Sequence, residues 1–233
     1  AGFAHEEAGG SLAIGIMPPA QQLAPLLMES LRAAIPALHL ELTVAAHGDI
    51  LRGLSEQRFG LGIVYLDQLP VGGAFEAHEL YVEQHVLVGG PGIVMPGRVR
   101  CSWGDAAGLP LCLLDRSMRS RQIVDRGFAE AGVVPDVRFE TNALDLLHAE
   151  LRAGRLASIL PVAALPPRTD GIPLQIRRLD PSLTPAVGLV RVRQPMTSAL
   201  MARCWHVASG LVLTDVLTME ERRSFLKKRT KKL

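Results

Sequence analysis

The sequence predicts an α/β fold of two lobes, with a hinge and a cleft between them. Residues Gly10–Val64 alternate strand, helix and strand in the order of a βαβ unit. A second alternation of strands and helices runs from Leu111 to Pro161, and the punctuating segment Gly89–Gly92 lies between the two. Because small molecules usually bind in clefts at domain interfaces, these patterns indicate a two-lobed binding protein or enzyme.

The first lobe is predicted from strand and helix periodicity. Strands are expected at Leu12–Ile16, Leu38–Val44, Leu61–Tyr65 and Leu80–Val88, and helices at Leu23–Ile35 and Ile50–Gln57. Pro36 ends the first helix, and Asp49 is the expected cap of the second. The glycines that follow Leu80–Val88 indicate a crossover or hinge there.

The second lobe repeats the pattern. Strands are expected at Leu111–Leu114, Val137–Glu140, Leu156–Leu160, Ile172–Arg178 and Ala186–Arg193, and helices at Arg119–Ala131, Asn142–Ala153 and Ser198 to about Leu217. Ser117, Thr141 and Asn142 are the expected helix caps. We therefore expect a linker remnant at 1–9, a first lobe at 10–89 with 190–217, a second lobe at 93–186, and a basic tail at 218–233.

Composition indicates a soluble globular protein. Hydrophobic residues make up 48 % and charged residues 21 %, and the mean hydropathy is +0.22. No apolar run approaches the roughly 18–20 residues that span a bilayer, and Ala1–Glu7 has no basic segment of a secretory signal. Three scattered cysteines, Cys101, Cys112 and Cys204, are expected to be reduced and buried. We expect a cytoplasmic protein without a membrane partner.

The net charge of +2 is unevenly distributed. Residues 220–233 contain seven basic and two acidic side chains, a charge of +5, which leaves −3 on the other 219 residues. A mildly acidic body argues against a phosphate-binding face on it. The tail either contacts nucleic acid or is simply solvated.

Catalytic motifs are absent from the sequence. It contains no GxSxG, GxGxxG or P-loop motif, and its seven histidines show no HxxxH or HExxH spacing. We therefore expect no enzyme activity, no cofactor and no metal site.

Two strand–loop–helix segments are candidate binding loops, because a helix N-terminus favours a carboxylate or similar group. In Met17–Ala20 the two prolines have no N–H, which favours an apolar or partly apolar ligand, or one held by Gln21 and Gln22. Alternatively, the prolines only start the helix. In the second segment, Arg116 and Arg119 either neutralise an acidic ligand or pair with surface acids.

Several segments together resemble the effector-binding domain of LysR-type transcriptional regulators, from about Gly10 to about Val212. These are the Gly10–Val64 unit, Val86-Leu87-Val88, Phe128-Ala129-Glu130-Ala131-Gly132 and Ala153-Gly154 to Leu160-Pro161. The resemblance implies two Rossmann-like lobes of the type 2 periplasmic-binding-protein fold. Gly60 departs from the family, which usually has Asp before this strand.

The resemblance also implies the function. A small-molecule effector would bind between the lobes, in contact with Met17, Pro18, Pro19, Ala20, Gly48, Val64, Tyr65, Arg116, Ser117, Met118, Thr141, Asn142 and Pro161. A homodimer or homotetramer would place helix Leu23–Ile35 against helix Arg119–Ala131, antiparallel. DNA would be bound only through an N-terminal helix-turn-helix absent from this chain, and RNA polymerase is a further partner of the full-length protein.

Two other functions remain open from the sequence. One is a periplasmic solute-binding protein of a transport system, which uses the same fold. The other is a two-lobed α/β enzyme, which would need a nucleophile, base or metal set.

Overall fold

The computed structural model describes residues 10–166 and 173–211, which divide into two compact units. Unit 1 comprises residues 10–81 and 187–211, and unit 2 comprises residues 82–166 and 173–186. The predicted linker remnant at 1–9, the start of the strand at Ile172, the end of the last helix and the basic tail lie outside the described residues.

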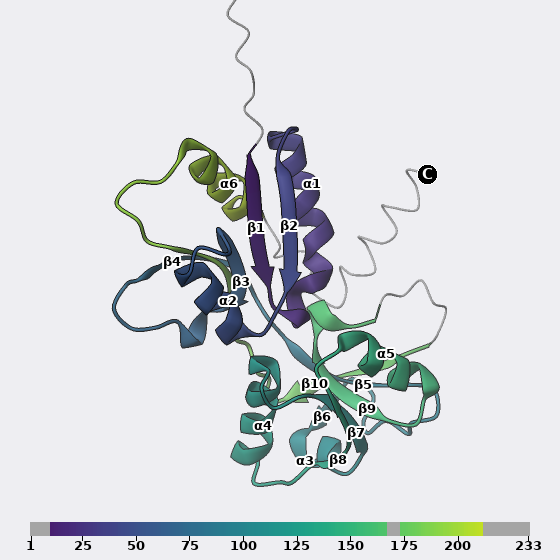
Figure 1. The fold of residues 1–233 in the computed structure, drawn as a ribbon. Coiled ribbons are helices and arrows are strands. Elements are labelled where there is room, and N and C mark those ends of the chain that lie inside the picture. Colours follow the sequence, from purple (N-terminus) through teal and green to yellow (C-terminus); the bar gives the residue numbers. More distant parts are fainter. Residues whose placement is uncertain (1–9, 167–172, 212–233) are drawn as a thin grey trace, which may run out of the picture. The chain divides into compact units, whose positions relative to one another are not determined.

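Unit 1 is built on a five-stranded mixed sheet with the order β2-β1-β3-β11-β4 (Figure 1). The strands are β1 Ser11–Ile16, β2 His39–Val44, β3 Leu61–Tyr65, β4 Phe75–Val82 and β11 Ala186–Val192. A 3₁₀ turn, Pro18–Leu23, leads into α1 Ala24–Ala34, and the other helices are α2 His47–Ser55 and α6 Ala199–Ser209. Strands β1, β2 and β3 are parallel, whereas β11 runs antiparallel to β3.

The helices of unit 1 pack on the sheet where its strands β1 and β3 are apolar. Every residue of β3 is buried, as are Leu12, Ile14 and Ile16 of β1. Helix α2 packs against β1 and β3, and α1 contacts α6, where Arg203 donates a hydrogen bond to the carbonyl of Ala34. The strands predicted at Leu12–Ile16, Leu38–Val44 and Leu61–Tyr65 are thus confirmed.

Unit 2 is built on a six-stranded mixed sheet with the order β6-β10-β5-β9-β7-β8. Its strands are β5 His85–Gly89, β6 Arg100–Ser102, β7 Pro110–Leu114, β8 Asp136–Thr141, β9 Ala157–Pro161 and β10 Gln175–Asp180. Its helices are α3 Trp103–Ala107, α4 Arg119–Glu130 and α5 Leu144–Ala153, followed by a 3₁₀ turn at Val162–Ala164. Strands β7, β8 and β9 are parallel, and β5 is antiparallel to β9 and β10.

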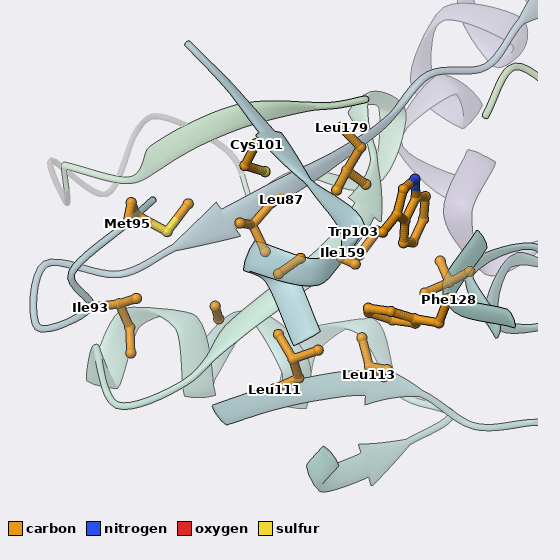
Figure 2. Close-up of a cluster of buried hydrophobic side chains, with 13 residues drawn as sticks. Leu87, Ile93, Met95, Cys101, Trp103, Leu111, Leu113, Phe128, Ile159 and Leu179 are labelled. Carbon is orange, nitrogen blue, oxygen red and sulfur yellow. The ribbon is translucent and has the colours of Figure 1, made fainter. Parts of the chain in front are cut away.

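Alternate residues of the central strands fill two separate cores in unit 2. Leu111 and Leu113 of β7 point to the core beneath α3 and α4, while Cys112 and Leu114 point to the core beneath α5. Figure 2 shows the first core, in which the rings of Trp103 and Phe128 pack edge to face with centroids 5.1 Å apart. The sequence did not predict β6 and α3, the elements that bring Cys101 and Trp103 into this core.

The prediction of a single strand at Leu80–Val88 is wrong. The chain forms β4 up to Val82 and β5 from His85, and the two strands belong to different sheets. The crossover is therefore at Glu83-Gln84, upstream of the glycines where it was expected. The polar residues Glu83, Gln84 and His85 interrupt the apolar pattern between the two strands, and the prediction of one strand did not use this interruption.

The glycines of Gly89–Gly92 serve a packing contact within unit 2. A Cβ on Gly90 would collide with the carbonyl oxygen of Leu151, and a Cβ on Gly92 would lie 2.5 Å from the carbonyl oxygen of Gly154. Gly154 ends α5 in the left-handed conformation, with φ of 74°. The segment is glycine-rich because its backbone approaches the end of this helix closely.

Helix α4 and the remaining strands follow the sequence prediction to within two or three residues at each end. No helix in the parts of the chain described is long and apolar enough to cross a membrane.

Candidate functional site

The carboxyl ends of three parallel strands form one edge of the sheet of unit 1. The Met17 N–H donates to the Ile63 carbonyl at 3.1 Å and holds the loop after β1 beside β3, while the Ala45 N–H donates to the Ile16 carbonyl at 3.1 Å and holds the loop after β2 beside β1. In open α/β sheets, ligands bind beyond this edge. All seven candidate residues of unit 1 lie here: Met17, Pro18, Pro19, Ala20, Gly48, Val64 and Tyr65.

Most of these seven residues are buried. Met17 is 2 % exposed, and Ala20, Val64 and Tyr65 are fully buried, as are the two prolines. Only Gly48, in the first turn of α2, is exposed. The side chains of the candidate residues at this edge are therefore mostly apolar, and Gly48 is the accessible residue among the seven.

Unit 2 has the corresponding edge at the carboxyl ends of β7, β8 and β9. The Asp115 N–H donates to the Thr141 carbonyl at 2.8 Å, which joins the loop after β7 to the end of β8. The structure brings together the candidates Arg116, Ser117, Met118, Thr141, Asn142 and Pro161 at this edge. Arg116, Ser117 and Asn142 are exposed, whereas Met118 and Pro161 are buried.

Three α-helices begin at these two edges, and none is capped by a side chain. The residues at the N-cap positions of α2, α4 and α5 are apolar: Ala46, Met118 and Ala143. The other two described α-helices that begin after an extended residue, α3 and α6, start with Ser102 and Ser198, whose hydroxyls accept from Asp105 N–H and Met201 N–H. The edge helices thus keep first-turn N–H groups that no N-cap side chain satisfies.

The caps predicted for these helices are wrong. Asp49 lies inside the first turn of α2, which begins at His47. The Ser117 N–H donates to Asp115 Oδ1 at 2.9 Å, one residue ahead of the N-cap. Thr141 Oγ1 accepts from the Ala143 N–H at 3.1 Å and so forms a turn before α5, and Asn142 is exposed beside it.

The helices differ in the charge of their first turns. Asp49 and Asp145 lie in the first turns of α2 and α5, but the first turn of α4 contains no acidic residue. Hydrogen bonds from Ser117 lower the pKa of the nearby Asp115. Since acidic side chains offset the positive end of a helix, the first turn of α4 opposes a negative group less than the first turns of α2 and α5 do, and the nearest carboxylate before it is that of Asp115.

A buried arginine holds the start of α4 against the sheet, and sequence reasoning missed it. Arg121 is 1 % exposed, and its Nη1 donates to the Leu114 carbonyl at 2.8 Å. Its Nε lies 2.7 Å from Asp125 Oδ1, and its Nη1 lies 2.7 Å from Glu140 Oε1. Burial alone would lower the pKa of Arg121, but the bonds to Asp125 and Glu140 outweigh it and raise that pKa. The i, i+4 spacing of Arg121 and Asp125 was a usable indication.

The two arginines predicted to meet a ligand are placed differently. The Arg116 side chain is 75 % exposed, and its Nε lies 4.0 Å from Glu140 Oε1. Arg119 donates to Gln122 Oε1 at 3.4 Å along α4. Arg116 is thus only loosely paired and remains accessible at the edge.

A buried histidine lies beside the same helix start. His85 Nε2 is 3.3 Å from Ser120 Oγ, and both residues are buried. Burial lowers the pKa of His85 to about 4, although the Leu183 carbonyl acts in the opposite direction. His85 is therefore neutral near pH 7 and joins β5 to α4.

The described residues contain no cluster of three or more His, Cys, Asp or Glu side chains able to hold a metal ion. Cys101, Cys112 and Cys204 are free and buried. Burial raises the pKa of Cys112 to about 12 and that of Cys101 to about 11, so these thiols are poor nucleophiles.

The model of the LysR substrate binding domain matches residues 5–210 of this chain. Among curated proteins, the chain is 23 % identical over 191 residues to the HTH-type transcriptional regulator SsuR of Burkholderia cenocepacia. The match covers 80 % of this chain and 61 % of SsuR, so the chain spans less than two thirds of the length of that relative.

Solved structures of regulators show the same fold. The regulatory domain of Synechocystis CcmR, solved in complex with 2-PG, has a TM-score of 0.76 at 15 % identity, over 87 % of this chain and 97 % of CcmR. Full-length CbnR in complex with target DNA has a TM-score of 0.67 at 19 % identity, over 85 % of this chain and 69 % of CbnR. The match to the family model and to SsuR favours a regulatory domain over a solute-binding protein of transport.

Proposed function

Because the chain belongs to the LysR substrate-binding domain family, we propose that it senses a small-molecule effector for a transcriptional regulator. The observation that carries this proposal is the grouping of uncapped helix starts at the carboxyl edges, where α2, α4 and α5 begin with apolar N-cap residues. Helix N-termini concentrate N–H donors and partial positive charge, which suits a ligand with an acceptor or negative group. We propose that both units contribute their edges to one effector.

The effector we propose has an anionic or acceptor-rich end and an apolar body. Its negative group would face the start of α4, where no acidic residue lies in the first turn and Arg116 is accessible. The apolar part would lie against Met17, Pro18 and Pro19, which offer neither hydroxyl groups nor, at the prolines, N–H donors. The ligand of CcmR, 2-PG, shows that a domain of this fold can bind a small molecule.

Signalling requires a partner surface as well as a ligand. An effector shifts an equilibrium only by its differential affinity for two states. We propose that a homodimer or homotetramer, with α1 of one protomer against α4 of another, passes the change to a helix-turn-helix domain of the whole protein. The complex of CbnR with its DNA supports DNA as the final partner. Contact with RNA polymerase, a cytoplasmic location and the absence of enzyme activity are part of the same proposal.

The proposal is tested by a ligand screen with a chemical readout. Small organic acids and aromatic metabolites are screened by thermal shift, and each hit is titrated by calorimetry and recovered for mass spectrometry. The expected result is a bound, unconverted ligand that perturbs the NMR amide signals of Gly48, Ser117 and Asn142. Conversion of the ligand would favour an enzyme, and a ligand that perturbs none of these three amides would contradict the site.

A further inference from the structure

Unit 1 contains a pocket at the opposite end of β3 from the carboxyl edge. The pocket has a volume of about 190 Å³ and lies where the end of α2, the start of β3, the end of β11 and the start of α6 meet. Its lining residues are Leu54, Gln57, Phe59, Gly60, Arg191, Val192, Gln194, Thr197 and Met201. The effector proposed above does not use this pocket.

Arg191 lines the pocket, and one of its donors makes no hydrogen bond within the described residues. Its Nε and Nη2 bind Glu76 Oε2 at 2.8 and 2.7 Å, and its guanidinium carbon lies 4.4 Å from the centre of the Trp205 ring. These contacts fix the guanidinium on two sides. The third nitrogen, Nη1, is buried and has no hydrogen-bond partner among the described residues. A buried donor of this kind requires an acceptor.

The rim of the pocket contains an unusual backbone conformation. Gln57 has φ of 60°, and among the described residues it is the one non-glycine residue with positive φ. Its N–H donates to the Leu54 carbonyl at 3.1 Å as α2 ends. Glycine would adopt this backbone conformation without strain. A glutamine at this lining position adopts it at a cost in conformational free energy.

The floor of the pocket is apolar and depends on a residue without a side chain. A Cβ on Gly60 would collide with the terminal methyl group of Met201 and would lie 2.9 Å from Leu12 Cδ1. Leu54, Phe59 and Met201 are therefore the large apolar side chains of a pocket that also has polar lining residues. The charge of Arg191 is already matched by Glu76, so a second negative charge is not needed there.

We propose that this pocket is a second ligand site, which takes a small uncharged carbonyl compound with a compact apolar body. The carbonyl oxygen accepts from Arg191 Nη1, and the body contacts Leu54, Phe59 and Met201. The amides of Gln57 and Gln194 and the hydroxyl of Thr197 provide polar groups at the mouth.

The test is an NMR titration of the ¹⁵N-labelled protein with cyclohexanecarboxamide. Saturable shifts are expected at the Gly60 amide and the Trp205 indole, with a dissociation constant of about 1 mM. Sodium cyclohexanecarboxylate, of the same shape but charged, is expected to bind about tenfold more weakly, because Glu76 opposes it. Equal binding of the two probes, or shifts confined to Ser117 and Asn142, would overturn the proposal.

Three variants locate the binding. Thr197→Leu fills the mouth of the pocket and is expected to abolish the shifts. The substitution removes no hydrogen bond described for the pocket residues. Arg191→Lys removes Nη1 and is expected to weaken binding about tenfold. The matched control is Met196→Leu, since Met196 is 87 % exposed and does not line the pocket. Unchanged affinity in Thr197→Leu would overturn the proposal, as would equal loss in Met196→Leu.

Discussion

The guanidinium of Arg121 and the carboxylate of Glu140 are joined by a 2.7 Å contact between Nη1 and Oε1, which fastens α4 to β8. The same nitrogen donates to the Leu114 carbonyl at the end of β7. One buried side chain therefore ties together a helix start and two strand ends of the proposed effector edge.

Replacing Arg121 by Ala should destabilise unit 2 by about 3 kcal/mol, since it empties a buried site and removes the partner of two carboxylates. The measurement is the midpoint of urea unfolding. Arg138→Ala is the control, because the Arg138–Asp136 pair at 2.6 Å is largely exposed and its loss should leave the midpoint unchanged. Equal shifts in both variants would contradict the assigned role of burial.

Protonation of His85 should weaken the fold in acid. The pKa of His85 is about 4 in the folded protein and 6.5 for the free side chain, so the unfolded chain takes up the proton first. This histidine contributes about 3 kcal/mol above pH 6.5, and the contribution is lost as the pH falls from 6.5 to 4.

The variant His85→Gln should therefore show a flatter dependence of unfolding free energy on pH across that interval. The control is Met196→Gln at an exposed position without a titratable group, which should leave the slope as it is. A slope that is the same in the parent and in His85→Gln would show that other groups cause the acid sensitivity.

The proposed dimer can be disrupted by a charge on either helix. Ala33 of α1 and Ala129 of α4 are exposed, so Ala33→Glu and Ala129→Glu should each leave the fold intact and yield monomers in sedimentation velocity. Ala202→Glu, an exposed position on α6, is the matched control and should remain a dimer. A parent protein that is monomeric at every concentration would contradict this assembly.

A capping side chain added at the start of α2 should raise the stability of the protein and weaken its binding of the ligand. Ala46 has the extended backbone of an N-cap residue, with φ of −67° and ψ of 153°, so Ala46→Asp should stabilise α2 by about 1 kcal/mol. The new carboxylate would occupy N–H groups that we assign to the effector. Affinity for the ligand identified in the screen should fall about tenfold by calorimetry.

The control for this variant is Ser102→Ala, which removes the capping box of α3. It should cost about 1 kcal/mol and leave ligand affinity unchanged. If Ala46→Asp gains stability and binds as well as the parent, the start of α2 is not part of the effector site.

Local sequence patterns predicted much of the fold and the placement of the candidate site. Strand Leu61–Tyr65 was predicted to the residue because five apolar residues lie between Gly60 and the turn at Leu66–Gln68. The split between β4 and β5 coincides with the polar residues Glu83, Gln84 and His85, but a short polar run does not show that the two strands pair in different sheets. The role of Arg121 likewise depends on Glu140, which is distant in sequence.

The candidate binding residues were grouped at the two edges by the rule for parallel strands, and the structure places them there. Their burial was not foreseen, because Met17 and Tyr65 have no local feature that distinguishes a lining residue from a core residue. The predictions of the helix caps were wrong for a related reason. Ser117 and Thr141 have capping chemistry, but their side chains and backbones are engaged in turns one or two residues too early.

The order of strands in unit 1 has a consequence for synthesis on the ribosome. Strand β11 lies between β3 and β4, yet it is made after all the strands of unit 2. Nascent chains thus expose β4 without its neighbour while β5 to β10 emerge and pair. Unit 2 can complete its sheet first. The sheet of unit 1 is complete only after Ala186–Val192 has been synthesised and has paired between β3 and β4.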